Sequence, residues 1–390
     1  MTEPLKILMV LHMPWQRNLG AGRVQLELAE EFRQLGHQVE KFDSEDAAAQ
    51  HARSGQGKKF NFVEQAIAHV RAYGHRFDII DAHQGNLPTT KASLNFSGLL
   101  VARSVALYAL YDQFSRSRAA RLPAWKLRAR YANAVGLWRD RRNTPNYVRS
   151  LQACDLINLP NQEEYAYVRD RLHLGDKCVV FPFGLSPARR AALQAAARSP
   201  GDRLAQPKLV FIGTWSRRKG ANDWPALIRT LKQQVPTLRC CFLGTGLSAA
   251  TVLSELRQPA GDWLEIMPHY DSADLPQLLS EATVGAFPSY VEGFGFAVLE
   301  KLAAGVPTVA YDAAGPREML QFLPDSLRVP IGDWRQMAAQ LVQLLQQLPT
   351  AYGQLSQDCQ AIAARFCWRD IAIATLTAYH QTPVTGQPED

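Results

Sequence analysis

Residues 282–320 read ATVGAFPSYVEGFGFAVLEKLAAGVPTVAYDAAGPREML, and this stretch decides the fold class. Its apolar run Val284–Phe287 predicts a short buried strand, which Pro288 ends. The apolar spacing from Gly293 to Gly305 then predicts a helix, because glycine favours the position just after a helix end. The stretch therefore predicts one strand, loop and helix unit of an α/β fold.

Two glutamates in this stretch, Glu292 and Glu300, have seven residues between them. Gly293 and Gly295 leave the backbone without side chains where the helix begins, so its free amides and positive dipole end can approach an anion such as a diphosphate. Glu300 falls within the helix, where a carboxylate can accept hydrogen bonds from two adjacent hydroxyls such as a ribose diol. The competing interpretation gives Glu300 and Lys301 to a solvated helix face and Glu292 to an ordinary loop.

Length and composition indicate a globular protein of two domains. The chain has 390 residues, of which 47% are hydrophobic and 20% are charged, which is typical of folded domains with their own cores. The apolar run Leu5–Leu11 is too short for a signal peptide core or a membrane span, so we expect a cytoplasmic protein. Six cysteines without CxxC spacing predict reduced core residues, with no zinc site and no disulfide framework.

The amino-terminal half alternates strand and helix patterns. Leu5–Leu11 predicts a buried central strand that leads through Gly20 and Gly22 into a helix over Arg23–Leu35. Further strands are predicted at 38–42, 77–81 and 98–103, with a helix at 61–73, and such alternation is typical of a doubly wound parallel sheet. The polar segment 43–59 is expected to be a mobile loop.

Residues 112–150 carry a strong basic bias. Ten Arg or Lys residues stand against two Asp, and Trp125, Tyr131 and Trp138 are interleaved with them. This composition suits either an interfacial helix on an anionic membrane or a solvated basic helix packed on the sheet. The net charge of +7 also favours an anionic partner. No nucleic-acid-binding motif accompanies the charge, so we expect no nucleic acid partner.

The carboxyl-terminal half repeats the α/β alternation. A buried strand at 208–213 is followed by the basic loop TWSRRKG at 214–220, and a strand at 238–246 ends in a GxG turn. Helices are predicted at 333–348, 352–366 and 368–379. By itself the RRKG segment is more typical of an ordinary basic surface loop.

The stretch 288–320 resembles the signature of retaining glycosyltransferases of family 4, which have the GT-B fold. The shared features are the PS pair, EGFG, a second Glu eight positions after the first, AxGxPTVA, and a Gly before another Glu. The resemblance implies that Glu292 lies by the donor sugar hydroxyls, that Gly293, Phe294, Gly295 and Phe296 line the donor, and that Glu300 holds the ribose. It also implies two Rossmann-like domains facing a cleft.

The same resemblance implies domain boundaries. VVFPFG at 179–184 is similar to the family's end of the first domain, which gives an acceptor-side domain at 1–185 and a linker at 186–206. The donor domain would span 207–365, and the helix at 366–380 would cross back onto the first domain.

Further site residues follow from the resemblance. Lys219 matches the lysine that neutralises the donor diphosphate, and Thr214 stands where many members have Arg. Arg217 or Arg218 can supply the missing guanidinium. The glycines Gly213 and Gly244 are expected near the donor, and the expected acceptor-side residues are Gly20, Gly22, His83 and Arg103. Close relatives have a His near the reaction centre where this chain has Val105.

Two functions remain open at this point. The first is a retaining transferase that uses a nucleoside-diphosphate sugar, with a UDP-sugar favoured, and a glycan or lipid-linked acceptor. It would need no metal and no further cofactor, since the chain has no Asp-x-Asp pair and the leaving phosphate can take the acceptor proton. It would be cytoplasmic, with a peripheral membrane contact through 112–150. The second is a non-catalytic subunit that binds nucleotide sugar or a partner enzyme, which Val105 and Thr214 favour.

Overall fold

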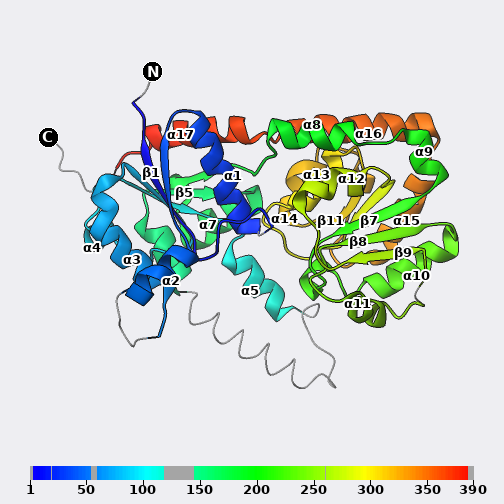
Figure 1. The fold of residues 1–390 in the computed structure, drawn as a ribbon, viewed down its shortest axis with the longest axis horizontal. Helices are drawn as coiled ribbons and strands as arrows, with labels where there is room; N and C mark the ends of the chain where they lie inside the picture. The colour runs from blue at the N-terminus through cyan, green and yellow to red at the C-terminus, as the bar shows by residue number, and fades with distance from the viewer. Residues whose placement is uncertain (1–2, 19, 54–58, 118–144, 260, 385–390) are drawn as a thin grey trace. The chain divides into compact units, whose positions relative to one another are not determined.

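The computed structural model describes residues 3–18, 20–53, 59–117, 145–259 and 261–384. The chain divides into two compact units, and each has its own parallel sheet (Figure 1). The first unit comprises Met1–Asp112, Leu122–Phe183 and Trp368–Asp390, and the second comprises Gln113–Arg121 and Gly184–Cys367.

The sheet of the first unit has six parallel strands in the order β2-β1-β3-β4-β5-β6. Their bounds are β1 Lys6–Val10, β2 Gln38–Phe42, β3 Ile79–His83, β4 Leu99–Arg103, β5 Leu156–Leu159 and β6 Cys178–Val180. The helices of the amino-terminal half are α1 Gly20–Gln34, α2 Ser44–Arg53, α3 Phe62–Tyr73, α4 Lys91–Leu94, α5 Tyr108–Arg116 and α7 Gln162–Leu172. Short 3-10 turns, η1 Gly74–Arg76 and η3 Gly175–Lys177, join helices to strands.

The sheet of the second unit has the order β12-β11-β10-β7-β8-β9, again all parallel. Its strands are β7 Lys208–Ile212, β8 Arg239–Leu243, β9 Leu264–Met267, β10 Val284–Phe287, β11 Thr308–Tyr311 and β12 Arg328–Val329. Its helices are α8 Pro187–Ala195, α9 Pro200–Ala205, α10 Trp224–Gln234, α11 Ala249–Leu256, α12 Leu275–Leu279, α13 Phe296–Ala303, α14 Ala314–Leu320, α15 Trp334–Leu345 and α16 Pro349–Ala364. The 3-10 turns are η4 Arg217–Lys219, η5 Ser272–Asp274 and η6 Asp325–Leu327.

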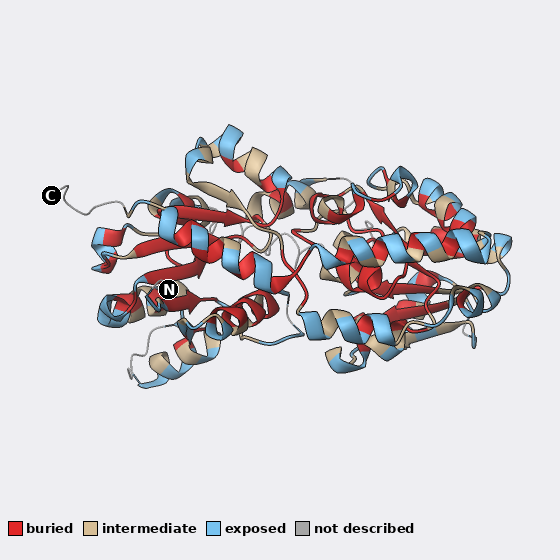
Figure 2. Ribbon diagram, turned by 90° about the horizontal axis from the view of Figure 1, so that it is seen from above, coloured by how far each residue is buried: buried red, intermediate tan, exposed pale blue. Residues whose placement is uncertain are grey.

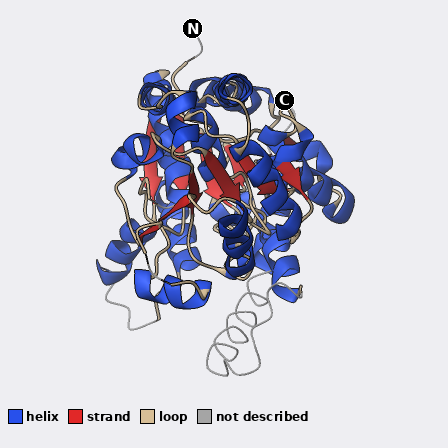
Figure 3. Cartoon of the chain, turned by 90° about the vertical axis from the view of Figure 1, so that its right-hand side faces the viewer, coloured by secondary structure: helices blue, strands red, loops and turns tan. Residues whose placement is uncertain are grey.

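The central strands of each sheet are buried because helices cover the faces of the sheets (Figure 3). Every residue of β3 and β4 is buried, and so is every residue of β10 and β11 (Figure 2). The continuous apolar runs that predicted buried strands at 5–11, 208–213 and 284–287 are therefore confirmed.

Helix α17, Trp368–Gln381, completes the first unit although it follows the second in sequence. It packs against α1, and its Trp368 Nε1 donates to Glu27 Oε2 over 2.5 Å. Its Tyr379 hydroxyl donates to Asp81 Oδ2 over 2.5 Å and accepts from Arg103 Nη2 over 3.0 Å. Buried polar groups need such partners, so this network fixes α17 on the sheet.

The segment expected to be a mobile loop and the segment expected to be the interdomain linker both contain helices. Residues 43–59, predicted to be a mobile loop, include α2, whose first amides are capped by Asp43 Oδ1. Residues 186–206, predicted to be a linker, form α8 and α9, each with a serine cap followed by proline. Serine at the cap and proline at the first helical position are strong helix start signals.

The described residues hold no cross-linked cysteine: five of the six thiols are buried and all are free. Burial raises the pKa of Cys154 and Cys240 to about 12, so both stay protonated at neutral pH. Across the same described ranges, no helix is both long enough and apolar enough to cross a bilayer.

Candidate active site

Strand order places two loops of the second unit together. β7 and β10 are neighbours in the sheet, and the chain leaves them in opposite directions, to β8 and to β11. Ligands of open α/β sheets bind at such a switch point, beyond the carboxyl ends of the strands. The loops after β7 and β10 touch here: Tyr290 N donates to Arg218 O over 2.8 Å. A Cβ at Gly220 would lie 2.4 Å from Pro288 O, so only glycine fits.

The side chains of Lys219 and Glu292 meet between these loops. The Lys219 ammonium donates to Glu292 Oε2, and Arg218 Nη1 lies 3.7 Å from the same oxygen. Ser289 Oγ donates to it over 3.2 Å. Two cations and one anion therefore share a cluster whose Lys and Glu side chains are only 12% and 16% exposed.

Protonation in this cluster follows from burial and charge. Burial by itself raises the pKa of Glu292, but the charges of Lys219 and Arg218 outweigh it and hold the pKa below its ordinary value. Burial lowers the pKa of Lys219, and the charge of Arg218 adds to that effect against the opposing charge of Glu292. Glu292 is thus a carboxylate at neutral pH, and the cluster carries a net positive charge that suits an anionic group.

The start of α13 has the bare backbone that the sequence predicted. Gly295 is its cap residue with φ 97°, a conformation that favours glycine. Gly315 N donates to Glu292 O over 3.1 Å, and a Cβ at Gly315 would lie 2.4 Å from Phe294 Cα. The loop that carries Glu292 is consequently held by α14. Phe294 is buried against Phe366, while Phe296 is only half-buried.

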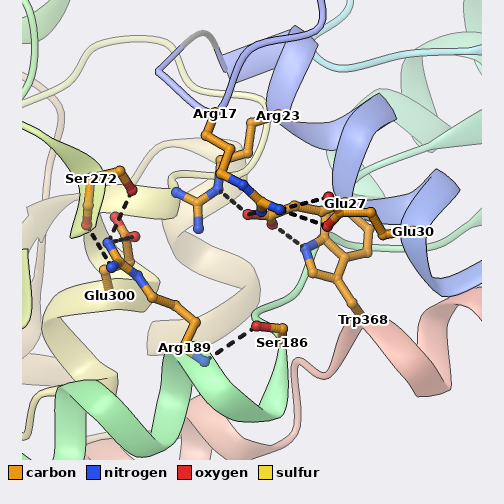
Figure 4. A network of polar contacts seen from close by, with 9 residues as sticks. All are labelled: Arg17, Arg23, Glu27, Glu30, Ser186, Arg189, Ser272, Glu300 and Trp368. Carbon is orange, nitrogen blue, oxygen red and sulfur yellow. Dashed lines mark hydrogen bonds and ion pairs between the residues drawn. The ribbon is translucent and has the colours of Figure 1, made fainter.

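Glu300 and Lys301 do not belong to a solvated helix face, so that part of the competing interpretation is wrong. Glu300 is 3% exposed and Lys301 is 0% exposed. Lys301 Nζ donates to Ala286 O over 3.2 Å, and burial, with the charge of Lys219, lowers its pKa to about 7. Glu300 Oε1 accepts from Arg189 Nη2 over 3.1 Å (Figure 4). No pattern in the sequence marks Arg189 as a site residue.

The other predicted residues of this unit are the two arginines before Lys219 and the two glycines Gly213 and Gly244. Arg218, not Arg217, lies against Glu292; the pKa of Arg217 is lowered by burial against the charge of Glu255. Gly213 with φ 151° and Gly244 with φ 71° both require glycine after β7 and β8. Their amides bond to Leu243 O and Met267 O, respectively, so these turns continue the sheet edge.

The first unit has its own switch point, between β1 and β3, and two histidines meet there. The ring centroids of His12 and His83 are 5.0 Å apart. His83 Nδ1 lies 3.0 Å from Gln84 O, which fixes that nitrogen as the donor, and Asn86 hydrogen-bonds to His12. The sequence predicted His83 and missed His12, whose signal is its place directly after the first strand.

The remaining acceptor-side predictions have different outcomes. Gly22 lies in α1 where a Cβ would come within 2.3 Å of Pro14 O, whereas Gly20 faces open space. Arg103 is 1% exposed, with three hydrogen bonds to Asp81 and one to Tyr379. Its guanidinium joins β3, β4 and α17, so the expectation that it lines the acceptor side is corrected to a structural role.

The loop after β4, which carries Val105, is held by hydrogen bonds to its neighbours. Gln84 Nε2 donates to Ala106 O over 2.8 Å, and Leu107 N donates to Glu164 Oε1 over 2.9 Å. Most of the basic segment 112–150 lies outside the described residues, so its packing is left as predicted. Among the described residues no group of three or more His, Cys, Asp or Glu is placed to hold a metal ion.

Two Rossmann-like units, each on a six-stranded parallel sheet, define the GT-B glycosyltransferase fold. Sucrose-phosphate synthase from Thermosynechococcus elongatus superposes with a TM-score of 0.71 at 17% identity, covering 96% of this chain and 98% of that one. HepE of Anabaena, in complex with UDP and glucose, gives a TM-score of 0.66 at 17% identity, covering 97% of this chain and 100% of that one.

Residues 206–347 match the model of the family described as "Glycosyl transferases group 1". Glycogen synthase of Mycobacterium tuberculosis (strain CDC 1551 / Oshkosh) is 26% identical over 185 residues, which are 47% of this chain and 44% of that protein. The matched portions thus span less than half the length of the first curated relatives. Residues 206–347, which match the family model, contain Lys219, Arg218 and Glu292.

Proposed function

We propose that this protein is a retaining, family 4 glycosyltransferase that moves a sugar from a nucleoside-diphosphate sugar to a glycan or lipid-linked acceptor. The observation that carries the proposal is the cluster of Lys219, Arg218 and Glu292 at the switch point of the second unit, inside the residues that match the family model. The proposal also rests on the glycine-lined start of α13 beside that cluster.

The cluster supplies the charge that the reaction needs. The donor diphosphate replaces Glu292 as the anion beside Lys219 and Arg218, which leaves the Glu292 carboxylate to accept from the sugar hydroxyls. As the anomeric C–O bond breaks, its electron pair moves to the diphosphate oxygen, where the two cations and the amides at the start of α13 stabilise it. The acceptor oxygen attacks the same face, and its proton passes to the leaving phosphate. No divalent ion is required in this scheme.

The donor and acceptor classes draw on the relatives. The HepE structure contains UDP and glucose, which supports a UDP-sugar donor here, held at its ribose by Glu300. The glycogen synthase similarity supports a glycan acceptor. His12 and His83 at the switch point of the first unit are the acceptor-side groups that we propose in place of a histidine at Val105.

Thermal unfolding against UDP, GDP and ADP sugars tests the donor site, because a ligand that binds only the folded state raises the midpoint. We expect a rise with a UDP-sugar that Lys219→Ala abolishes, since the diphosphate loses its nearest cation. The control Lys59→Ala removes an exposed lysine of the first unit and should keep the full rise. A rise that Lys219→Ala retains would contradict the assignment of Lys219.

Product analysis then separates the proposed enzyme from its alternative. Proton NMR of the product should show the anomeric configuration of the donor, with a rate unchanged by EDTA. The alternative is a non-catalytic subunit, favoured by Val105 and Thr214 in place of the usual His and Arg. It predicts a midpoint rise with the nucleotide sugar and no turnover with any glycan or lipid-linked acceptor.

The basic segment supports a peripheral contact with the inner face of a membrane. Replacing Arg128, Arg130, Arg141 and Arg142 with Ser should lower sedimentation with anionic liposomes at low salt, because each lost charge weakens attraction to the headgroups. Neutral liposomes provide the control, and equal sedimentation of both proteins with anionic liposomes would contradict the membrane contact.

A further inference from the structure

Arg189 reaches from α8 to the glutamate that we assign to the ribose. It lies in the first turn of α8, where the Ser186 side chain accepts from its backbone amide over 3.2 Å. Its Nη1 donates to Ser272 O over 2.6 Å, and its Nη2 donates to Ser272 Oγ over 3.3 Å and to Glu300 Oε1 over 3.1 Å. Figure 4 shows the side chain extended from its helix to both partners.

These contacts hold the guanidinium in one place. The side chains of Arg189 and Glu300 are 15% and 4% exposed, so water competes weakly for their charges. A planar guanidinium that bonds two partners with different nitrogens has little rotational freedom left. The helix that carries it is also fixed, since α8 packs against α12 and α13.

The hydrogen bond between Arg189 and Glu300 restricts the orientation of the Glu300 carboxylate. A carboxylate accepts hydrogen bonds through two oxygens, and one of these oxygens accepts from Arg189. The torsion that turns the carboxylate is thereby restricted before any nucleotide arrives. Binding a diol with a carboxylate already oriented costs less conformational entropy than binding it with a free one.

We propose that Arg189 is a positioning residue for nucleotide recognition, which orients Glu300 toward the two ribose hydroxyls. This inference rests on the proposed function, in which Glu300 holds the ribose. Arg189 itself does not contact the reacting atoms. The opposite role is a lock, in which Arg189 occupies Glu300 and must leave before nucleotide binds, and the two roles predict changes of opposite sign.

Calorimetric titration of the full chain with UDP and with 2′,3′-dideoxy-UDP distinguishes them. In Arg189→Met we expect UDP to bind about tenfold more weakly, since hydrogen bonds to a charged group are individually worth about this factor. Dideoxy-UDP, which has no diol, should bind both proteins equally. Tighter UDP binding would establish the lock and overturn the positioning role, as would unchanged affinity or an equal loss for both nucleotides.

The neighbouring residue provides a matched control. Arg190 lies in the same turn of α8 and its Nη1 contacts Ala364 O over 3.2 Å, so Arg190→Met removes the same charge without touching Glu300 and should bind UDP as the wild type does. If Arg189→Met fails to fold, Arg189→Lys keeps the charge but cannot span both partners, and it should show the same selective loss for UDP.

A double-mutant cycle completes the test. Because Arg189 acts through Glu300, the variant that combines Arg189→Met with Glu300→Gln should bind UDP no more weakly than Glu300→Gln alone. Additive losses would overturn the inference while leaving the donor site intact. A wild type that binds no nucleotide would instead refute the proposed function, and the role of Arg189 would fall with it.

Discussion

At the residue scale, His12 and His83 of the first unit differ from the charged cluster of the second in being held neutral. Burial, with the charge of His12, lowers the pKa of His83 to about 3, against the opposing bond to Gln84 O. Burial also lowers the pKa of His12. A neutral imidazole can accept a proton or a hydrogen bond from a hydroxyl, which suits the acceptor-side role proposed for these two residues.

Neutral His83 makes the stability depend on pH with a defined sign. In the unfolded chain a histidine takes up a proton near pH 6.5, whereas folded His83 stays neutral down to about pH 3. The unfolded state therefore binds more protons in this window, and stability falls as pH falls, by about 1.4 kcal/mol per unit. In urea unfolding at pH 7, 6 and 5, His83→Asn should lose this part of the slope.

The control for that experiment is His75→Asn, which removes an exposed histidine of the same unit. Equal slopes for the wild type and His83→Asn between pH 7 and 5 would contradict a neutral His83.

Residue identities were predictable where a local pattern carries them. Glu292, Gly295 and Lys219 stand in short motifs, so the residues next to them in sequence indicate their place in the site. Arg189 and Glu300 are 111 positions apart, and nothing local to either residue marks their contact. Arg103 was misassigned for the same reason, because Tyr379, 276 positions away, is one of the partners that make it structural.

At the element scale, the loops after β7 and β10 depend on a close backbone approach. Gly220 has φ 81°, and a Cβ there would overlap Pro288. Gly220→Ala should therefore destabilise the second unit by more than about 1 kcal/mol, since both the left-handed backbone and the overlap penalise a side chain. It should also weaken nucleotide binding, because Lys219 precedes the displaced glycine. Thermal unfolding and calorimetric titration measure the two effects.

Gly201→Ala is the matched substitution. Gly201 lies inside α9 with no atom closer than 4.0 Å to an added Cβ, so alanine should stabilise the helix by up to about 1 kcal/mol. Comparable stability losses in the two variants would contradict a specific role for the loop contact.

Elements were predicted best where apolar runs are long. The buried strands and the helices α15, α16 and α17 follow from periodicity, which samples many residues at once. Short polar helices such as α2, α8 and α9 have few apolar positions, so only their cap residues predict them from the sequence. The serine and proline pairs at 186–187 and 199–200 are the sequence signals for the two helices within the predicted linker.

At the scale of the whole molecule, α17 ties distant segments of the first unit together. Tyr379→Phe removes a buried hydroxyl that bonds both Asp81 and Arg103. Each of these buried charged groups then lacks one hydrogen bond. We expect a loss of about 1–3 kcal/mol in the free energy of unfolding. Urea unfolding monitors it, with Tyr73→Phe as the control because Tyr73 is 46% exposed. A loss no larger than that of the control would contradict the anchoring role.

The discontinuous make-up of the first unit has a consequence for synthesis. Residues 184–367 form the second unit from an almost continuous stretch, whereas the first unit needs residues 368–381, which leave the ribosome later. The sheet of the first unit is therefore synthesised before the second unit, but its last helix is synthesised after it. A premature stop codon near position 367 would leave the second unit whole and remove α17 from the first, and such a product would be a natural substrate for chaperones.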